Sequence, residues 1–534
     1  MESLAEALAA VDYSQDAIHD LLGDGPFAAM ARDHIVPAAL RVRTLLEGSG
    51  SVRSEAVRSG QRRLAGAVDF FLLGGSASPE ALDAVLGEGA FELLRDLNLI
   101  AEAEQSDAAG AWRAAVDLRP HAADDGTDLW VAADLGAHQR PGALKRDHVL
   151  GVGQASLTLA QLTERRAVET ALDLGTGCGI QTFHLLPHVR HITATDLSAR
   201  ALAFTRFNLM LNAAALGVDP QRLEERVELL QGSLLEPVAG RSFDLIVSNP
   251  PFVITPRREG ERPEDWYTYR DGGLPGDQVV AQLIREIPRH LNPGGRAQLL
   301  GNWEIYESDQ SDQQQWDARP RTWLSEGTEA WLIQREQLTP EQYAETWLCD
   351  AAQNRDPQLF ESTYTDYLVD FAARGVCGIG FGLIWLRRPA DDAAPLRRFE
   401  EITYPIQQLI APFITQAVQA WDLLKTLDDQ AFRAAHLEVA EDVTEERHQR
   451  PGAEHPGVIL LREGAGLRRT EVLSTEAAGF VSACDGQLTV GQIVHALGAL
   501  LDWEDSQTAE TLVEQVRRLV ERGFLTVAPG HGEG

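Results

Sequence analysis

The chain has 534 residues, which is too long for one ordinary hydrophobic core, so we expect about two to four domains. Its 44% hydrophobic and 24% charged residues are normal for a globular protein, and it shows neither an apolar run of transmembrane length nor a signal peptide. Because such a run is missing, we expect no membrane partner. The net charge of −33 repels polyanions, which disfavours a surface coated with nucleic acid.

Cysteine usage bears on metal binding and on the cellular compartment. The four cysteines are scattered along the chain, and none belongs to a CxxC pair. This spacing argues against a zinc site or a disulfide framework, and it suits a reducing environment. The sequence therefore predicts a cytoplasmic protein without a metal site. The cysteines are Cys178, Cys349, Cys377 and Cys484.

A basic stretch interrupts this acidic chain. Between residues 41 and 63 there are six arginines and only two glutamates, Glu47 and Glu55. The stretch is either the solvated face of a helix or a docking patch for phosphate or an acidic partner. The arginines are Arg41, Arg43, Arg53, Arg58, Arg62 and Arg63.

Residues 1–145 have the pattern of a mostly helical domain, and the first 25 residues resemble one amphipathic helix. Ser78 stands as a helix N-cap before a proline, and residues 78–104 then predict a helix, a short break, a second helix and a β-like tail. That order is typical of winged-helix domains, and it also occurs in ordinary helical packing. Residues 115–121 and 128–136 alternate enough to be strands.

From residue 146 to residue 390 the pattern changes to strands that alternate with helices. Continuous apolar strands joined by helices indicate a mostly parallel sheet covered on both faces. The last two strands can pair antiparallel and complete a sheet of seven strands. The predicted strands are residues 170–175, 191–196, 226–232, 243–249, 296–302, 330–336 and 378–388, with a turn at 292–295 before the fifth.

The last zone, residues 391–534, begins after a segment rich in proline and charge at 387–398. Residues 473–502 predict a helix, an Asp-Gly turn and a second helix, and a third helix and a short strand follow. This pattern indicates a winged-helix-like module near residues 473–527. A dimerisation or packing module would give a similar sequence.

A glycine-rich loop, DLGTGCG at residues 173–179, lies between a predicted strand and a helix. Its glycines let the backbone turn tightly and approach a ligand without a Cβ in the way. Asp196 ends the next strand, 21 residues after Gly175, where a carboxylate can accept hydrogen bonds from ribose hydroxyls. The loop lacks the lysine of a phosphate-binding P-loop, and its spacing leaves open whether the ligand is a nucleotide or a nucleoside.

Four motifs follow one another in this zone: LDLGTGCG at 172–179, TDLS at 195–198, QGSLLEP at 231–237 and DLIVSNPPF at 244–252. Together they resemble class I S-adenosylmethionine-dependent methyltransferases, in particular the NPPF/NPPY group that methylates planar nitrogens. This group includes release-factor glutamine methyltransferases, small-subunit ribosomal RNA guanine-N2 methyltransferases and adenine-N6 enzymes. The resemblance covers residues 146–300 by motif and reaches residue 390 by strand order.

The resemblance implies an α/β fold with a Rossmann-like, seven-stranded methyltransferase domain at residues 146–390. Mostly helical, winged-helix-like N- and C-terminal domains, at residues 1–145 and 391–534, would flank it. The first of these would recognise the substrate or act as a lid. Upstream of the first strand, residues 146–163 are similar to the segment that precedes it in the ribosomal guanine enzymes. There Gly153 and Ser156 would lie nearest the cofactor, unless the segment is an ordinary loop.

The implied cofactor is S-adenosylmethionine. Asp173 would fix its methionine amine, Asp196 its ribose hydroxyls, and Leu197 would flank the adenine. Ser233 stands where this superfamily often has Asp, so its contact with the adenine amine would be weaker. The implied cofactor-binding residues are Asp173, Gly175, Thr176, Gly177, Gly179, Asp196, Leu197, Ser233, Leu234 and Asn249.

The tetrapeptide Asn-Pro-Pro-Phe must end its strand, because proline cannot donate to a sheet ladder. A planar amino group is a poor nucleophile because its lone pair is delocalised, and two acceptors on its hydrogens would favour pyramidalisation. The Asn249 side-chain oxygen and the Pro250 carbonyl can supply them, since each proline restricts the residue before it. Phe252 offers an aromatic face for a planar group. We therefore expect Asn249, Pro250 and Phe252 to be catalytic.

The methyl acceptor stays open at this point. The charge of −33 and the last domain favour a planar nitrogen of a peptide or protein. The basic stretch and the phenylalanine at the fourth motif position favour guanine N2 of ribosomal RNA or another nucleic-acid base. A third alternative is a non-catalytic cofactor-binding scaffold. The oligomeric state does not follow from the sequence.

Overall fold

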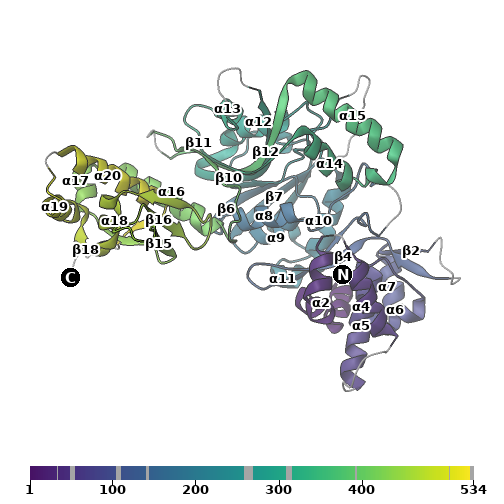
Figure 1. Cartoon of the computed structure of the whole chain (residues 1–534). Coiled ribbons are helices and arrows are strands. Elements are labelled where there is room, and N and C mark those ends of the chain that lie inside the picture. Colours follow the sequence, from purple (N-terminus) through teal and green to yellow (C-terminus); the bar gives the residue numbers. More distant parts are fainter. Residues whose placement is uncertain are drawn as a thin grey trace. The chain divides into compact units, whose positions relative to one another are not determined.

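The computed structural model describes residues 1–32, 34–47, 55–103, 110–139, 144–257, 269–307, 315–390, 394–503 and 506–528. They fall into two compact units (Figure 1). The first unit consists of Met1–Ala160, Arg166–Ala390 and Arg397–Glu400, and the second of Gln161–Arg165, Asp391–Leu396 and Glu401–Gly534. The division into three domains at about residues 145 and 390 stays a prediction. No helix within these described ranges combines the length and the apolarity needed to cross a bilayer.

The N-terminal part of the first unit is mostly helical, as predicted, but its first 25 residues form two helices instead of one. The chain turns at Asp12, whose φ is +57°, and Ser14 then caps the second helix by accepting a hydrogen bond from the Ala17 N–H at 3.2 Å. Hydrophobic periodicity does not register such a cap. The helices are α1 (Glu2–Ala10), α2 (Gln15–Leu22), α3 (Asp24–Met30), α4 (Val36–Leu46), α5 (Glu55–Leu72), α6 (Pro79–Leu86) and α7 (Ala90–Asp96).

Short strands accompany these helices. Ser78 caps α6 as predicted, accepting a hydrogen bond from the Ala81 N–H at 3.3 Å. The two strands expected before residue 137 are present as an antiparallel pair, β4 and β5. The winged-helix interpretation of this part stays a prediction. The strands are β1 (Ser76–Ala77), β2 (Ile100–Glu102), β3 (Trp112–Ala114), β4 (Asp117–Ala122) and β5 (Asp128–Ala133), of which the first three form a sheet in the order β1-β3-β2.

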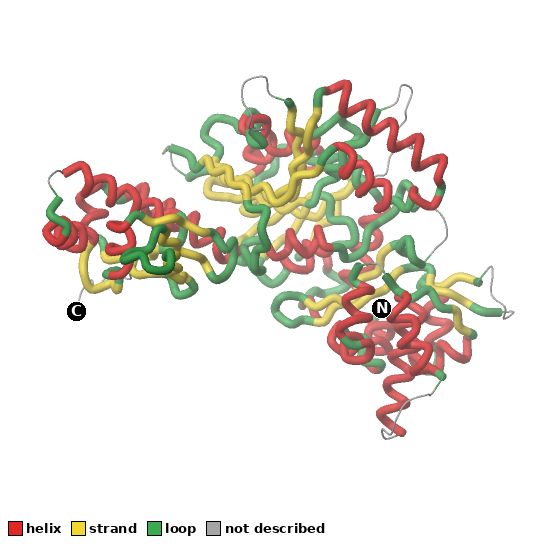
Figure 2. Tube along the Cα trace, in the orientation of Figure 1, coloured by secondary structure: helices red, strands yellow, loops and turns green. Residues whose placement is uncertain are grey.

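A central sheet of eight strands lies between helices, as Figure 2 shows in yellow and red. The strands β10, β9, β6, β7 and β8 are parallel neighbours, and β12 pairs antiparallel with both β10 and β11. The order is β13-β11-β12-β10-β9-β6-β7-β8. The strands are β6 (Val168–Leu174), β7 (Val189–Asp196), β8 (Val227–Gln231), β9 (Phe243–Ser248), β10 (Leu291–Tyr306), β11 (Glu329–Leu338), β12 (Val376–Arg387) and β13 (Arg397–Glu401).

All seven predicted strands are present, and the antiparallel pairing of the last two is confirmed. The sheet gains an eighth strand, β13, at the edge beside β11. The predicted turn at 292–295 lies inside β10 and not before it. There the register with β9 shifts between Leu291, which pairs with Phe243, and Arg296, which pairs with Leu245. Gly294, with φ +77°, lets the strand absorb the extra residues.

Both faces of the sheet are buried, as a parallel sheet requires. Along β6, Ala171 faces the core under α9 (Ile180–Leu185) and α10 (Ala199–Leu211), and Leu172 faces the core under α12 (Gln278–Glu286). Successive side chains of a strand point to opposite faces, so one apolar run serves two cores. The other helices of this part are α8 (Gln154–Leu162), α11 (Ala213–Leu216), α13 (Ala318–Arg321), α14 (Pro340–Asp350) and α15 (Pro357–Arg374).

The second unit has its own core, which includes Phe432, Phe480 and Phe524. The predicted helices near 473–502 are present, but the Asp-Gly pair begins a strand, β18, that pairs with β14. The winged-helix interpretation stays a prediction here too. The elements are α16 (Ala411–Thr426), α17 (Asp429–Ala434), α18 (Thr475–Ser482), α19 (Val490–Leu500), α20 (Ser506–Glu521), β14 (His436–Val439), β15 (Val443–His448), β16 (Val458–Glu463), β17 (Thr470–Leu473), β18 (Asp485–Thr489) and β19 (Leu525–Val527).

Candidate active site

The candidate site lies at the carboxyl ends of the parallel strands. β6 and β9 are hydrogen-bonded neighbours, with Leu174 opposite Ser248. Gly175 and Asn249 follow these two residues directly, so the glycine loop and the Asn-Pro-Pro-Phe segment emerge side by side. Both motifs therefore share one edge of the sheet. Open α/β sheets bind their ligands at that edge.

The glycine loop is a tight turn that needs its glycines. Gly175, Gly177 and Gly179 have φ values of +77°, +58° and +98°, which other residues rarely adopt. A Cβ on Gly177 would meet no atom within 4 Å, whereas one on Gly179 would lie 3.0 Å from the Phe183 ring. Gly177 therefore leaves open space for a ligand, and Gly179 permits close packing of α9.

Asp196 closes the loop from the neighbouring strand. Its Oδ2 accepts a hydrogen bond from the Gly177 N–H at 3.0 Å, and its Oδ1 accepts one from the Ser198 N–H at 2.8 Å. Ser198 caps α10 by accepting a hydrogen bond from the Ala201 N–H. Burial raises the pKa of the Asp196 carboxyl, and the two backbone donors oppose that rise. Each carboxylate oxygen keeps a further lone pair, so the group can still accept bonds from a ligand.

Asp173, at the end of β6, is 1% exposed. Its Oδ2 accepts three hydrogen bonds, from the hydroxyls of Thr176 and Thr182 at 2.7 Å each and from the Thr182 N–H at 3.0 Å. Its Oδ1 has no hydrogen-bond partner among the described residues. Burial raises the pKa of Asp173 to about 6, although the three bonds oppose the shift. Oδ1 is thus a buried acceptor that a ligand amine would satisfy.

The Asn-Pro-Pro-Phe segment forms a turn that presents oxygens. The Pro250 carbonyl accepts a hydrogen bond from the Phe252 N–H at 2.8 Å, which leaves one of its two lone pairs. The Asn249 Oδ1 is buried and makes no hydrogen bond within the described ranges. Just before the turn, the Ser248 hydroxyl donates to the Leu174 carbonyl at 2.7 Å, tying β9 to β6. We call residues 249–252 the NPPF turn.

One cavity brings most of the predicted residues together. Asp173, Gly179 and Phe252 do not line it, and of the upstream segment Ser156 lines it whereas Gly153 does not. The Phe252 ring instead packs edge-on against other aromatic rings, so its predicted stacking role stays a prediction. The predicted residues that line the cavity are Gly175, Thr176, Gly177, Asp196, Leu197, Ser233, Leu234, Asn249 and Pro250.

The lining residues that were not predicted include His148, Tyr269 and Asp271. The Tyr269 ring lies edge-on to the His148 ring at 5.8 Å, and its hydroxyl donates to an Asp350 carboxylate oxygen at 3.1 Å. His148 belongs to the upstream segment 146–163, which the resemblance already places near the cofactor, whereas Tyr269 and Asp271 come from a segment that only the fold brings there. No local motif marks Tyr269 and Asp271, although an aromatic and an acid shortly after NPPF are a weak signal.

Arg53 of the basic stretch lies outside the described residues.

The acceptors of the site fit the S-adenosylmethionine that the resemblance implies. The Asp173 Oδ1 is a buried acceptor without a partner in the described structure. The methionine amine of the cofactor would satisfy it, and a buried polar group without a partner costs free energy. The open space at Gly177 beside Asp196 suits a ribose.

Comparison with known proteins agrees with this geometry. Residues 141–261 match the Methyltransferase small domain, and residues 10–114 match a Domain of unknown function (DUF7059). A ribosomal protein uL3 glutamine methyltransferase from Bradyrhizobium diazoefficiens is 35% identical over 29% of this chain and 46% of its own. A release factor glutamine methyltransferase from Geobacter sulfurreducens is 36% identical over 24% and 45%.

A ribosomal protein uL3 glutamine methyltransferase from Neisseria gonorrhoeae is 32% identical over 33% of this chain and 56% of its own. The chain therefore spans about half the length of the curated relatives that it matches. The matched residues 141–261 include every residue that lines the cavity except Tyr269, Asp271 and Gly272. This chain carries a methyltransferase small domain with the Rossmann-like fold of the class I methyltransferases.

Proposed function

We propose that this protein transfers a methyl group from S-adenosylmethionine to a planar amide nitrogen of a protein or peptide. One observation carries the proposal: the Asn249 Oδ1 is a buried acceptor without a partner in the described structure, at the cavity and beside the glycine loop. An acceptor kept unpaired at this place fits an amide N–H that arrives with the substrate. A non-catalytic scaffold would gain nothing from it.

The cofactor would supply an electrophilic methyl group on a sulfonium. The Asp173 Oδ1 would accept a hydrogen bond from its methionine amine, and Asp196 would accept bonds from its ribose hydroxyls. Gly177 would give the ribose room, and Leu197, exposed to 56%, would flank the adenine. Ser233 and Leu234 line the cavity, and Leu234 has the left-handed φ of +46°.

Two oxygens would act on the methyl acceptor. The Asn249 Oδ1 and the free lone pair of the Pro250 carbonyl would each accept one hydrogen of the target amide. Because the Phe252 N–H already bonds to the Pro250 carbonyl at 2.8 Å, this oxygen is fixed before the substrate binds. Acceptors fixed in advance need no reorganisation during reaction, which is the basis of electrostatic catalysis. No strong base is required, because the methylated nitrogen loses its proton afterwards.

A protein amide is favoured over RNA as the acceptor. The relatives reported above are named for glutamine methylation of ribosomal protein uL3 or of a release factor. The net charge of −33 also opposes association with a polyanion. Guanine N2 of ribosomal RNA is the second candidate, because the exposed Arg43 and Arg62 of the basic stretch would dock phosphate. Arg41 and Arg63 instead donate to the Leu21 and Val85 carbonyls at 3.2 and 2.8 Å.

We assign roles to the N- and C-terminal parts of the chain and place the protein in the cytoplasm. The mostly helical residues 1–145 would recognise the substrate, and the winged-helix-like module near 473–527 would bind it or pair two copies. The four cysteines are unpaired, as a cytoplasmic protein would have them.

Transfer of a radiolabelled methyl group into a lysate of cells that lack this protein tests the proposal. We expect label in acid-precipitable material that protease releases and RNase does not. Label that RNase releases would establish the RNA alternative. No incorporation, together with binding of S-adenosylhomocysteine by calorimetry, would establish the non-catalytic scaffold.

A further inference from the structure

The NPPF turn depends on anchors that lie outside it. Its two prolines have no N–H, so they cannot tie the chain to a neighbour. Three backbone donors follow them, and each bonds to a different partner. The Phe252 N–H bonds within the turn, the Val253 N–H donates to the Arg270 carbonyl at 2.8 Å, and the Ile254 N–H donates to the Tyr343 hydroxyl at 2.8 Å. The last anchor is a side chain 89 residues away in sequence.

Tyr343 belongs to α14 and is 0% exposed. Its hydroxyl oxygen accepts a second hydrogen bond, from the Asn302 Nδ2 at 2.8 Å, so both lone pairs are in use. Burial raises the pKa of the Tyr343 hydroxyl well above its usual value, so the group stays neutral. Ile254 is itself fully buried, and its N–H would lack a partner without this hydroxyl.

The same helix also holds the aromatic residue of the turn. The Phe252 ring lies edge-on to the Trp347 ring of α14 at 6.2 Å and to the Phe381 ring of β12 at 6.5 Å. Phe381 in turn stacks on Tyr343 at 5.6 Å. Arg270, whose carbonyl receives the Val253 N–H, donates from its guanidinium to the Trp347 carbonyl at 2.6 Å. Thus the hydroxyl anchor, the ring contacts and the backbone anchor all converge on α14.

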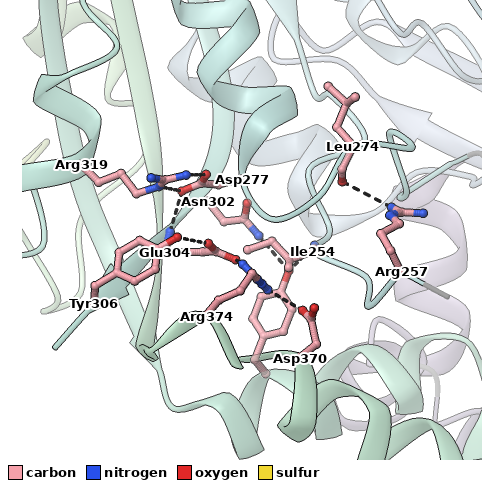
Figure 3. A network of polar contacts seen from close by, with 11 residues as sticks. Ile254, Arg257, Leu274, Asp277, Asn302, Glu304, Tyr306, Arg319, Asp370 and Arg374 are labelled. Carbon is pink, nitrogen blue, oxygen red and sulfur yellow. Dashed lines mark hydrogen bonds and ion pairs between the residues drawn. The ribbon is translucent and has the colours of Figure 1, made fainter. Parts of the chain in front are cut away.

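A polar network fixes the C-terminal part of β10, the strand that carries Asn302. The Asp277 carboxylate accepts a hydrogen bond from the Glu304 N–H at 2.9 Å and two from the Arg319 guanidinium at 2.6 Å each (Figure 3). Arg374, near the end of α15, bonds to Glu304 and, at 2.5 Å, to Asp370. The two carboxylates at 277 and 304 are buried and paired, so this end of β10 and α15 form a rigid base.

We propose that the helical pair α14–α15, inserted between β11 and β12, is a scaffold for the NPPF turn, and that Tyr343 is the positioning residue through which it acts. Tyr343 touches no reacting atom and does not line the cavity. It holds the Ile254 N–H, and thereby the direction in which Asn249 and Pro250 present their oxygens. This inference rests on the proposed function for its catalytic consequence, but not for the anchoring itself.

The variant Tyr343→Phe tests the inference in the full-length protein, because it removes only the hydroxyl and keeps the packed ring. We expect the methyl-transfer rate into lysate protein, at saturating cofactor, to fall by about tenfold to about a hundredfold, as for a small misplacement of a catalytic group. The dissociation constant for S-adenosylhomocysteine should stay within about twofold of the wild-type value, because the glycine loop is untouched. Hydrogen exchange in peptides that cover residues 249–257 should become faster.

The matched control is Tyr364→Phe on α15, whose hydroxyl donates to the Glu345 carboxylate at 3.1 Å on the outer side of the helical pair. It should leave the rate and the exchange unchanged. A merely structural role for Tyr343 would weaken cofactor binding and lower the rate together, and it would overturn the proposal, as would unchanged exchange at residues 249–257. If the wild-type protein transfers no methyl group, the proposed function fails, and hydrogen exchange alone decides whether Tyr343 anchors the turn.

Discussion

Replacing Asn249 by alanine separates catalysis from stability, because of how its side-chain oxygen is placed. The Asn249 Oδ1 is buried and bonds to nothing in the described structure. Its removal therefore breaks no hydrogen bond of that oxygen. The prolines still end β9, and the Ser248 hydroxyl still ties that strand to the Leu174 carbonyl at 2.7 Å. The folded protein should tolerate the change.

The magnitudes follow from the same placement. Loss of one preorganised partner of the reacting group should lower the rate by about 10²–10³, as does removal of one oxyanion-hole donor. A buried acceptor without a partner costs about 1–3 kcal/mol, so its deletion relieves free energy that lost packing then offsets. We expect the free energy of unfolding of Asn249→Ala to stay within about 1 kcal/mol of wild type.

The assay measures initial rates of radiolabelled methyl transfer into lysate protein and the midpoint of urea unfolding on the same preparations. Asn292→Ala is the matched control, because its amide donates to Asp244 at 2.8 Å near the start of β10, away from the cavity. It should keep the wild-type rate. An Asn249→Ala protein that retains more than about a tenth of wild-type transfer would refute the planar-nitrogen mechanism.

Three further predictions concern the cofactor side of the cavity. Asp196→Ala should weaken S-adenosylhomocysteine binding by about tenfold to about a hundredfold in calorimetry, because it loses charge-assisted bonds of about 1.5–3 kcal/mol. The control Asp219→Ala, which removes an exposed acceptor of the Gln221 N–H, should leave the affinity unchanged. Equal affinities of Asp196→Ala and the wild type would mean that Asp196 only closes the loop. Burial raises the pKa of Asp173 to about 6, and its proton would occupy Oδ1. Affinity for S-adenosylhomocysteine should therefore fall as the pH drops through 6, by up to about tenfold per pH unit, and Asp173→Asn should abolish this dependence. A flat wild-type affinity profile between pH 5 and 7 would contradict the prediction. Asn208→Leu removes hydrogen bonds to the backbone of Ala132 at 2.8 and 2.9 Å and to the Cys178 carbonyl at 2.9 Å. It should lower the midpoint of thermal unfolding and weaken ligand binding, both measured by fluorimetry. An unchanged midpoint would show that β5 and the glycine loop do not need this link.

The sequence by itself determined the elements whose signals are local. The glycines of the loop are needed for left-handed turns, and a double proline ends a strand whatever surrounds it. Apolar runs of strand length that alternate with helices specify a parallel sheet, whose carboxyl ends share one edge. For these reasons the seven strands, the cap at Ser78 and the meeting of Gly175 with Asn249 followed from composition and spacing.

Only the tertiary structure decided the features that depend on contacts between distant segments. β13 joined the sheet as an eighth strand, and the turn at 292–295 was absorbed into β10. Phe252 packed away from the cavity against Trp347, and the hydroxyl of Tyr343 reached Ile254 across 89 residues. Burial, which no local pattern encodes, set the pKa of Asp173 and left the Asn249 oxygen without a partner in the described structure. The motif specifies which atoms the site has, and packing of the rest of the chain decides where they point.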